Sequence, residues 1–197
     1  MRRFVGIALV VVLAGLGSVP TSAGQSRGAA SALPVIVFET SKGSFEVEMY
    51  PNEAPKSVEH ILTLVRRNFY NGLRVHRFEP GFVVQFGDPQ TRDVSKKASW
   101  GNGGSGRAIG VGEMHPKRTH KLGAVALAST NGDPTTADSQ VYICINPDPG
   151  RYSYMNGKYT VIGQVISGMN VVQQLRELDV IKRASVKGPA PAPAAKK

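Results

Sequence analysis

An arginine and a glutamine interrupt a run of apolar and aromatic residues, VHRFEPGFVVQFGD, at positions 75–88. Long polar side chains in such a run are rarely buried without partners, so Arg77 and Gln85 need an explanation. A guanidinium stays charged and presents several N–H donors in a rigid plane, which suits it to act on a weakly polar group of a substrate. Taken alone, the pattern favours a strand arginine that extends its head to solvent or pairs with a carboxylate.

Three other groups of residues could carry chemistry, and each pattern is incomplete. GNGGSG at 101–106 has the spacing of a dinucleotide-binding loop, but no strand precedes it and no helix starts on it, so we expect a surface loop. Glu113, His115 and His120 lack a recurring metal spacing and lie among basic residues, so we expect no metal site. Cys144 in the apolar run VYICI has no base nearby in sequence and is expected to be a small buried hydrophobe.

Short strands and two helices must position these residues. VIVFET at 35–40 and SFEVEMY at 44–50 flank a short turn, and their alternation predicts a hairpin. Apolar residues recur at helical spacing within 54–70, and the segment 169–178 predicts a second helix. Further strands are expected around 73–78, 81–86, 122–128, 139–145 and 159–166.

This order of elements indicates a mainly β fold. Many short strands with Gly- and Pro-rich turns favour an antiparallel sandwich or a closed barrel with helices at its ends. Strands and helices do not alternate regularly, which argues against a doubly wound parallel sheet.

The first 23 residues have the features of a secretory signal peptide. Two arginines come first, an apolar run follows, and small residues occupy positions 21 and 23. The apolar run is shorter than the roughly 20 residues that cross a bilayer, so no stable membrane insertion is expected after cleavage. We therefore expect an exported protein that works in the periplasm, in the cell envelope or outside the cell.

The rest of the chain divides into a short lead-in at 24–33, a folded domain at 34–180 and a tail at 181–197. The tail is rich in Pro, Ala and Lys, and we expect it to be disordered. The formal charge of the chain is +10, but residues 34–180 hold 16 basic and 14 acidic side chains. Surfaces that grip phosphate concentrate positive charge, so no nucleic-acid binding is expected. One cysteine allows no disulfide framework, so the hydrophobic core must hold the fold.

Several motifs occur in continuous order along residues 35–178. VHRFEPGFVVQFGD is similar to the pattern F-H-R-x-x-x-x-F-x-x-Q-G-G-D, with Phe86 in place of the first paired glycine. APKSVEHI, KLGAVALAST, DSQVYICI and NGKYTVIGQVISGMNVV match further motifs of the same family. On these motifs the chain resembles the cyclophilins, which are peptidyl-prolyl cis–trans isomerases.

The resemblance implies an eight-stranded antiparallel closed β-barrel with two capping α-helices, and isomerase activity without a metal or other cofactor. It implies that Arg77 is the catalytic arginine and that Gln85 helps to hold it. The other residues that it implies line the proline pocket or flank the peptide: His76, Phe82, Val83, Ala128, Ser129, Thr130, Gln140, Tyr142, Tyr154, Met155 and Tyr159.

The chain departs from the family pattern at several groove positions. Tyr154-Met155 replaces a common Trp-Leu pair, and Tyr159 replaces the pocket histidine. Val83 replaces a methionine, and Val141-Tyr142 replaces a Phe-Phe pair. The expected partners are proline-containing peptides and unfolded or folding proteins. Cyclosporin, a cyclic peptide ligand of the family, is expected to bind with reduced affinity because the indole donor is missing.

Two other functions stay open at this point. The chain could be a cyclophilin-like module that binds proline peptides without isomerising them. It could also be an envelope scaffold that acts through its basic tail. An isomerisation assay separates these alternatives from the enzyme.

Overall fold

The polar–apolar alternation near the start of the domain produces the predicted hairpin. The computed structural model describes residues 33–187, in which β1 (Val35–Thr40) and β2 (Gly43–Met49) pair antiparallel. Every second side chain of β1 is buried, as are Phe45, Val47 and Met49 in β2, and the rings of Phe38 and Phe45 stack 5.0 Å apart. The proposed signal peptide lies outside the described residues.

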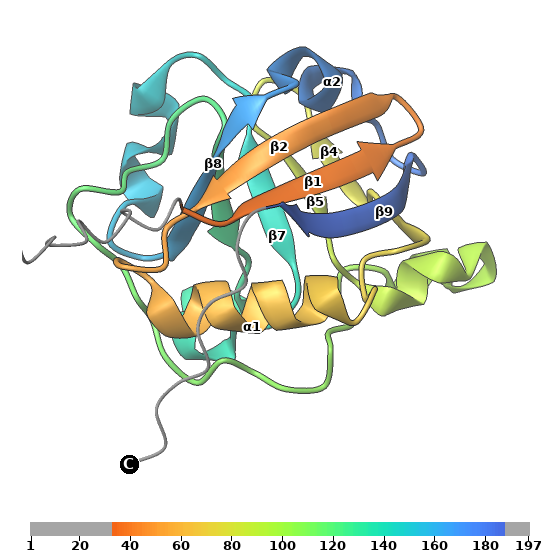
Figure 1. Ribbon diagram of the computed structural model, residues 1–197, viewed down its shortest axis with the longest axis horizontal. Coiled ribbons are helices and arrows are strands. Elements are labelled where there is room, and N and C mark those ends of the chain that lie inside the picture. Colours follow the sequence, from red (N-terminus) through yellow and green to blue (C-terminus); the bar gives the residue numbers. More distant parts are fainter. Residues whose placement is uncertain (1–32, 188–197) are drawn as a thin grey trace, which may run out of the picture. The chain divides into compact units, whose positions relative to one another are not determined.

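One antiparallel sheet contains all nine strands of the described chain, in the order β3-β9-β1-β2-β8-β6-β7-β5-β4 (Figure 1). Its remaining strands are β3 (Leu73–Arg74), β4 (Arg77–Glu79), β5 (Val83–Phe86), β6 (Ala124–Leu127), β7 (Val141–Cys144), β8 (Val161–Ser167) and β9 (Val180–Lys187).

The expected mainly β, antiparallel fold is confirmed, but its sheet is open and curled instead of closed into a barrel, and it counts nine strands because one predicted strand is divided. Among the described residues, the edge strands β3 and β4 do not pair with each other. They are consecutive pieces of the predicted strand 73–78, which divides at Val75 and His76. The Val75 N–H donates to the backbone carbonyl of Asp179, whereas the His76 N–H donates to the backbone carbonyl of Gln85. The two edges of the sheet are therefore connected by the backbone at Val75 and His76. In a closed barrel they would be connected by hydrogen bonds between β3 and β4.

Two helices lie at opposite ends of the sheet in Figure 1, as predicted. α1 (Pro55–Arg66) starts with a proline at its first turn, and the Glu113 carboxylate accepts from the N–H groups of Lys56 and Ser57. α2 (Met169–Gln174) is shorter than predicted. No helix within residues 33–187 is both long and apolar enough to cross a membrane.

The end of the domain was placed too early at residue 180. β9 continues to Lys187 and pairs with β1, and Ile181 and Ala184 are buried between their neighbours. The first seven residues of the predicted disordered tail are therefore part of the sheet. The three basic residues of β9 raise the excess charge of the folded region from +2 to +5. Residues 188–197 lie outside the described residues.

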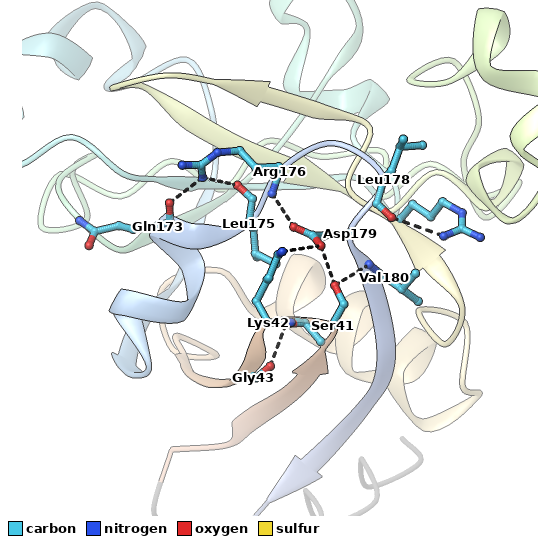
Figure 2. Close-up of polar contacts among 11 residues, drawn as sticks. Ser41, Lys42, Gly43, Gln173, Leu175, Arg176, Leu178, Asp179 and Val180 are labelled. Atoms are coloured by element: carbon cyan, nitrogen blue, oxygen red, sulfur yellow. Dashed lines mark hydrogen bonds and ion pairs between the residues drawn. The ribbon is translucent and has the colours of Figure 1, made fainter.

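Asp179 anchors the start of β9 to the first hairpin (Figure 2). Its carboxylate accepts from the Ser41 hydroxyl at 2.7 Å and from the Arg176 N–H at 2.8 Å. The Ser41 N–H donates to the Val180 carbonyl at 3.0 Å, and the Lys42 ammonium lies 3.7 Å from Asp179. These contacts fix the polar turn between β1 and β2 against the loop that follows α2.

Strands β5, β6 and β7 are buried on both faces, which explains their continuous apolar runs. One set of alternate residues, including Val84, Phe86 and Ile143, joins the main core together with the apolar face of α1. The other set, including Val83 and Tyr142, joins a second cluster with the 3₁₀ segment η5 (Pro149–Met155). We call these the inner and the outer face of the sheet.

Phe86, the departure from the family's paired glycines, points to the inner face. Its ring lies 5.3 Å from the ring of Phe38 and 6.2 Å from that of Tyr70. Gly87 next to it has φ +116°, and a Cβ there would collide with the backbone of Ser139. Only a glycine fits at this second position, whereas the first position can carry a core side chain.

Candidate functional site

Arg77 and Gln85 face each other across the ladder between β4 and β5. The Arg77 Nη1 lies 3.5 Å from the Gln85 Oε1, which is a long contact, and the arginine side chain is 49% exposed. The other end of the guanidinium lies 3.8 Å from Glu79, and both side chains of this pair are largely solvated, so the pair contributes little to stability. The guanidinium is therefore held near Gln85 but remains accessible.

Gln85 continues into a chain of side-chain contacts. Its Nε2 donates to the Gln140 Oε1 at 2.9 Å, and the Gln140 Nε2 donates to the carbonyls of Gly101 and Gly103 at 2.7 and 2.8 Å. The two amides are thereby oriented in series from the glycine-rich loop towards Arg77. Whether Gln85 helps to hold the arginine during catalysis stays a prediction.

The loop 101–106 is a wall of the site. The Asp88 carboxylate accepts from the N–H groups of Gly101 and Gly103, and a Cβ at Gly103 would collide with that carboxylate. The Asp138 carboxylate accepts from the Ser105 hydroxyl and from the Gly106 N–H. The prediction of a loop was correct, but the loop is held by the buried carboxylate of Asp88 and the partly buried carboxylate of Asp138.

A cavity of about 600 Å³, with several aromatic side chains in its lining, opens beside the guanidinium. Phe82 stacks on the rings of Tyr152 at 5.5 Å and Tyr154 at 6.5 Å, and Met155 is buried. Eleven of the thirteen predicted site residues line this cavity: His76, Arg77, Phe82, Val83, Gln85, Ala128, Ser129, Tyr142, Tyr154, Met155 and Tyr159.

The remaining two predicted residues, Thr130 and Gln140, line a second cavity of about 500 Å³. It shares Gln85, Ala128 and Ser129 with the first cavity, so the two adjoin, and we call them together the groove. The fold thus brings the predicted residues together from in or near β4, β5, β7 and η5 and from the loop after β6.

Some groove residues were missed by the sequence analysis. Trp100 and Asn102 line the first cavity, and Thr136 and Asp138 line the second. They lie in loops without periodicity, and their place depends on contacts such as the bond from the Trp100 Nε1 to the Gln90 carbonyl. The sequence feature that could have indicated these residues is the single tryptophan next to the glycine-rich stretch 101–106.

Burial controls the ionisation of several groups near the groove. Burial lowers the pKa of His76, and a coulombic attraction to Asp88 partly opposes this. Burial raises the pKa of the Cys144 thiol to about 12, which agrees with its predicted role as a small core residue. Burial also raises the pKa of Tyr142 well above its usual range. The first cavity therefore contains Arg77 as its cation beside neutral aromatic and imidazole rings.

The rejected metal candidates have other partners. Glu113 caps α1, and His120 bonds to Asn156 and Tyr142. Within residues 33–187, no group of three or more His, Cys, Asp or Glu side chains is arranged to hold a metal ion.

Comparison with known sequences identifies relatives over most of the chain. The family model for cyclophilin type peptidyl-prolyl cis-trans isomerase/CLD matches residues 35–191. The peptidyl-prolyl cis-trans isomerase-like 1 of Aspergillus fumigatus is 40% identical over 143 residues, which cover 71% of this chain and 80% of the relative. A probable peptidyl-prolyl cis-trans isomerase of Brucella suis is 34% identical over 182 residues, which cover 90% of each chain.

Solved structures support the same fold. A cyclophilin type peptidyl-prolyl cis-trans isomerase of Cryptosporidium parvum superposes with a TM-score of 0.65 at 23% identity, covering 79% of this chain and 98% of that one. The same protein was also solved in the presence of the dipeptide Ala-Pro, with a TM-score of 0.65. The family match, the two relatives and the curled sheet agree, and this chain belongs to the cyclophilin-type peptidyl-prolyl cis–trans isomerases.

Proposed function

We propose that this isomerase turns X-Pro bonds of exported proteins, with Arg77 as the catalytic donor and Gln85 as the residue that orients it. The observation that carries this proposal is the accessible guanidinium in the lining of a cavity that also holds several aromatic side chains, with two amides in series behind it.

The reaction needs no proton transfer and no covalent intermediate. Rotation about a peptide C–N bond is opposed by a barrier of about 18–20 kcal/mol because the nitrogen lone pair is shared with the carbonyl. X-Pro bonds populate both isomers, but they exchange over roughly tens to hundreds of seconds. A catalyst must therefore favour the twisted bond, in which the lone pair is localised on a pyramidal nitrogen.

Arg77 can supply an interaction that exists only in that twisted state. Its N–H groups donate to the prolyl nitrogen once the lone pair is localised, and the fork can reach the neighbouring carbonyl as well. An acceleration of about 10⁵ requires about 7 kcal/mol. One oriented donor contributes about 3–4 kcal/mol. Exclusion of water from the cavity and positioning of the peptide supply the remainder.

The shape of the groove supports an extended peptide as the substrate. The rings of Phe82, Tyr142 and Tyr159, with Val83 and Met155, form a cavity suited to the proline ring. The backbone of flanking residues would then lie along Ala128, Ser129, Thr130 and Gln140 in the second cavity. The Ala-Pro dipeptide of the related structure is a minimal ligand of this chemical class.

Catalysis is tested by exchange spectroscopy on a short X-Pro peptide with catalytic amounts of the chain lacking residues 1–23. We expect the cis and trans signals to exchange faster in proportion to the amount of enzyme. Binding without faster exchange would instead support the non-catalytic module, for which the exposed ion pair between Arg77 and Glu79 is the favouring observation. If the chain neither binds the peptide nor speeds its exchange, the envelope scaffold is the alternative that remains.

The proposed setting outside the cytoplasm rests on the first 23 residues of the sequence. We expect the mature chain to begin near Gly24, after the small residues Thr21 and Ala23. N-terminal sequencing of protein recovered from the exported fraction checks this. An intact Met1 in that fraction would contradict cleavage and favour an anchored protein.

A further inference from the structure

A buried histidine lies directly beneath the proposed proline pocket. His120 is 1% exposed and precedes β6, and its ring stacks on that of Tyr142 with 5.9 Å between centroids. Its Nε2 lies 2.8 Å from the hydroxyl oxygen of Tyr142, which is itself 4% exposed and lines the cavity. The mechanism proposed above uses Tyr142 as an apolar ring and gives His120 no role.

Asn156 determines which ring nitrogen of His120 carries hydrogen. One side-chain atom of Asn156 lies 2.8 Å from the backbone nitrogen of His120 and 2.8 Å from its Nδ1. The backbone N–H can only donate, so this atom must be the amide oxygen, which only accepts. Nδ1 must therefore carry hydrogen, and in the neutral ring Nε2 is left as an acceptor.

The direction of the bond to Tyr142 follows from this tautomer. An unprotonated Nε2 can only accept, so the Tyr142 hydroxyl donates to His120. The hydroxyl hydrogen is thereby directed below the pocket floor, and the pocket receives the ring alone. The ring of Tyr159 meets that of Tyr142 at 6.1 Å with an interplanar angle of 83°, so the two rings form adjoining walls.

We propose that His120 and Asn156 are positioning residues for Tyr142, and that protonation of His120 weakens binding of the proline ring in acid. This inference rests on the proposed function of the groove. A protonated His120 donates from Nε2, so the Tyr142 oxygen must become the acceptor. The hydroxyl hydrogen then has to turn to another partner or remain unpaired within an apolar cluster, which disturbs the pocket floor.

The surroundings of His120 define the range of pH in which this occurs. The titratable groups close to the Tyr142 hydroxyl are Cys144 on the same strand, Tyr154 in η5 and Tyr159. No salt bridge of residues 33–187 includes His120, and the nearby Arg118 is bound to Glu53. Burial lowers the pKa of His120, and the bond to Asn156 partly opposes this. The ring is neutral at pH 7, and the reversal of its bond to Tyr142 is expected below the usual histidine pKa of about 6.5.

The tautomer is tested first, on the unaltered protein. Long-range ¹H–¹⁵N correlation spectra of the histidine rings at neutral pH should show His120 with hydrogen on Nδ1 and none on Nε2. A neutral ring with hydrogen on Nε2 would overturn the inference, whatever the activity of the protein.

The link to binding is tested by titrating an Ala-Pro tetrapeptide while the pH is lowered through the transition of His120. We expect Kd and KM to rise about tenfold as His120 becomes charged, with a smaller change in kcat, because the loss is of ground-state contact with the proline ring. A Kd that stays constant through the titration of His120 would overturn the inference.

Two variants separate His120 from the other histidine of the groove. His76 also has a lowered pKa and lines the cavity, so His76→Gln should retain the acid-dependent loss of affinity. Tyr142→Phe, whose ring cannot exchange a hydrogen bond, should abolish the loss relative to its own affinity at neutral pH. The inference would be overturned if His76→Gln lost the acid dependence while Tyr142→Phe kept it.

If Tyr142→Phe does not fold, the tautomer of His120 and the titration of the unaltered protein still decide whether the inference holds. Absence of isomerase activity would refute the proposed function but would leave the tautomer and the peptide affinity measurable.

Discussion

The inner and outer faces of β5, β6 and β7 are built from alternate residues of the same strands and have different tasks. Phe86 and Ile143 on the inner face are fully buried and packed against the protein's own helix and hairpin. Gln85 and Tyr142 on the outer face lie opposite each other in the β5–β7 ladder and border a cavity. A strand that is apolar on both faces can therefore hold a core on one face and a binding surface on the other.

The comparison predicts that changes on the two faces separate stability from activity, and the largest effect is expected on the inner face. Phe86→Ala removes a ring that contacts the rings of Phe38 and Tyr70. It should lower the free energy of unfolding by about 3–5 kcal/mol, as measured by urea denaturation. The exposed Ile166 is a matched control, and Ile166→Ala should change stability by less than about 0.5 kcal/mol. A Phe86→Ala protein of normal stability would mean that the inner face is not the main core.

Arg77→Ala on the outer side should have the reverse effect. We expect kcat/KM to fall by about 10²–10³ because a donor that acts in the transition state is lost. The melting temperature should hardly change, since the side chain is half exposed. Arg77→Lys keeps the charge but loses the planar fork, so it should be nearly as inactive.

The control for Arg77 is another exposed strand arginine. Arg183→Ala on β9 lies away from the groove and should preserve both activity and stability. A folded Arg77→Ala protein with near-normal exchange would end the catalytic assignment and leave a peptide-binding sheet.

The smallest expected effect concerns the rim of the outer face. Tyr154 is 59% exposed and stacks beside Phe82, where many relatives are expected to carry an indole. Tyr154→Trp should strengthen cyclosporin binding by about tenfold, because an indole N–H adds a donor above an apolar face. Isothermal titration measures this. Equal affinities for the two proteins would show that this position does not limit binding of the ligand.

The hairpin, α1 and the short central strands could be predicted because their periodicity is local. β9 could not, because KRASVK reads as polar tail and becomes a strand only when β1 offers it a partner. The gap between β3 and β4 could not be predicted either, because it depends on which carbonyl groups accept from the N–H groups of Val75 and His76.

The candidate site shows the same division. Its strand residues, such as Arg77 and Gln85, follow from the resemblance, and both line the first cavity. Trp100 and Asp138 were missed because loop residues reach the groove only through contacts with distant segments. The bond between His120 and Tyr142 joins residues 22 apart and involves a tyrosine that departs from the family pattern, so no motif could indicate it.

The position of β9 between β1 and β3 has a consequence for how the chain folds. β1 is made first, but one of its two edges stays unpaired until a strand some 140 residues later is available, as the bond between Ser41 and Asp179 illustrates. Contacts between such distant segments make folding slow, because a long loop must close before they form. During synthesis the first hairpin therefore waits with an open edge, and the sheet is completed only after residues 180–187 have been added.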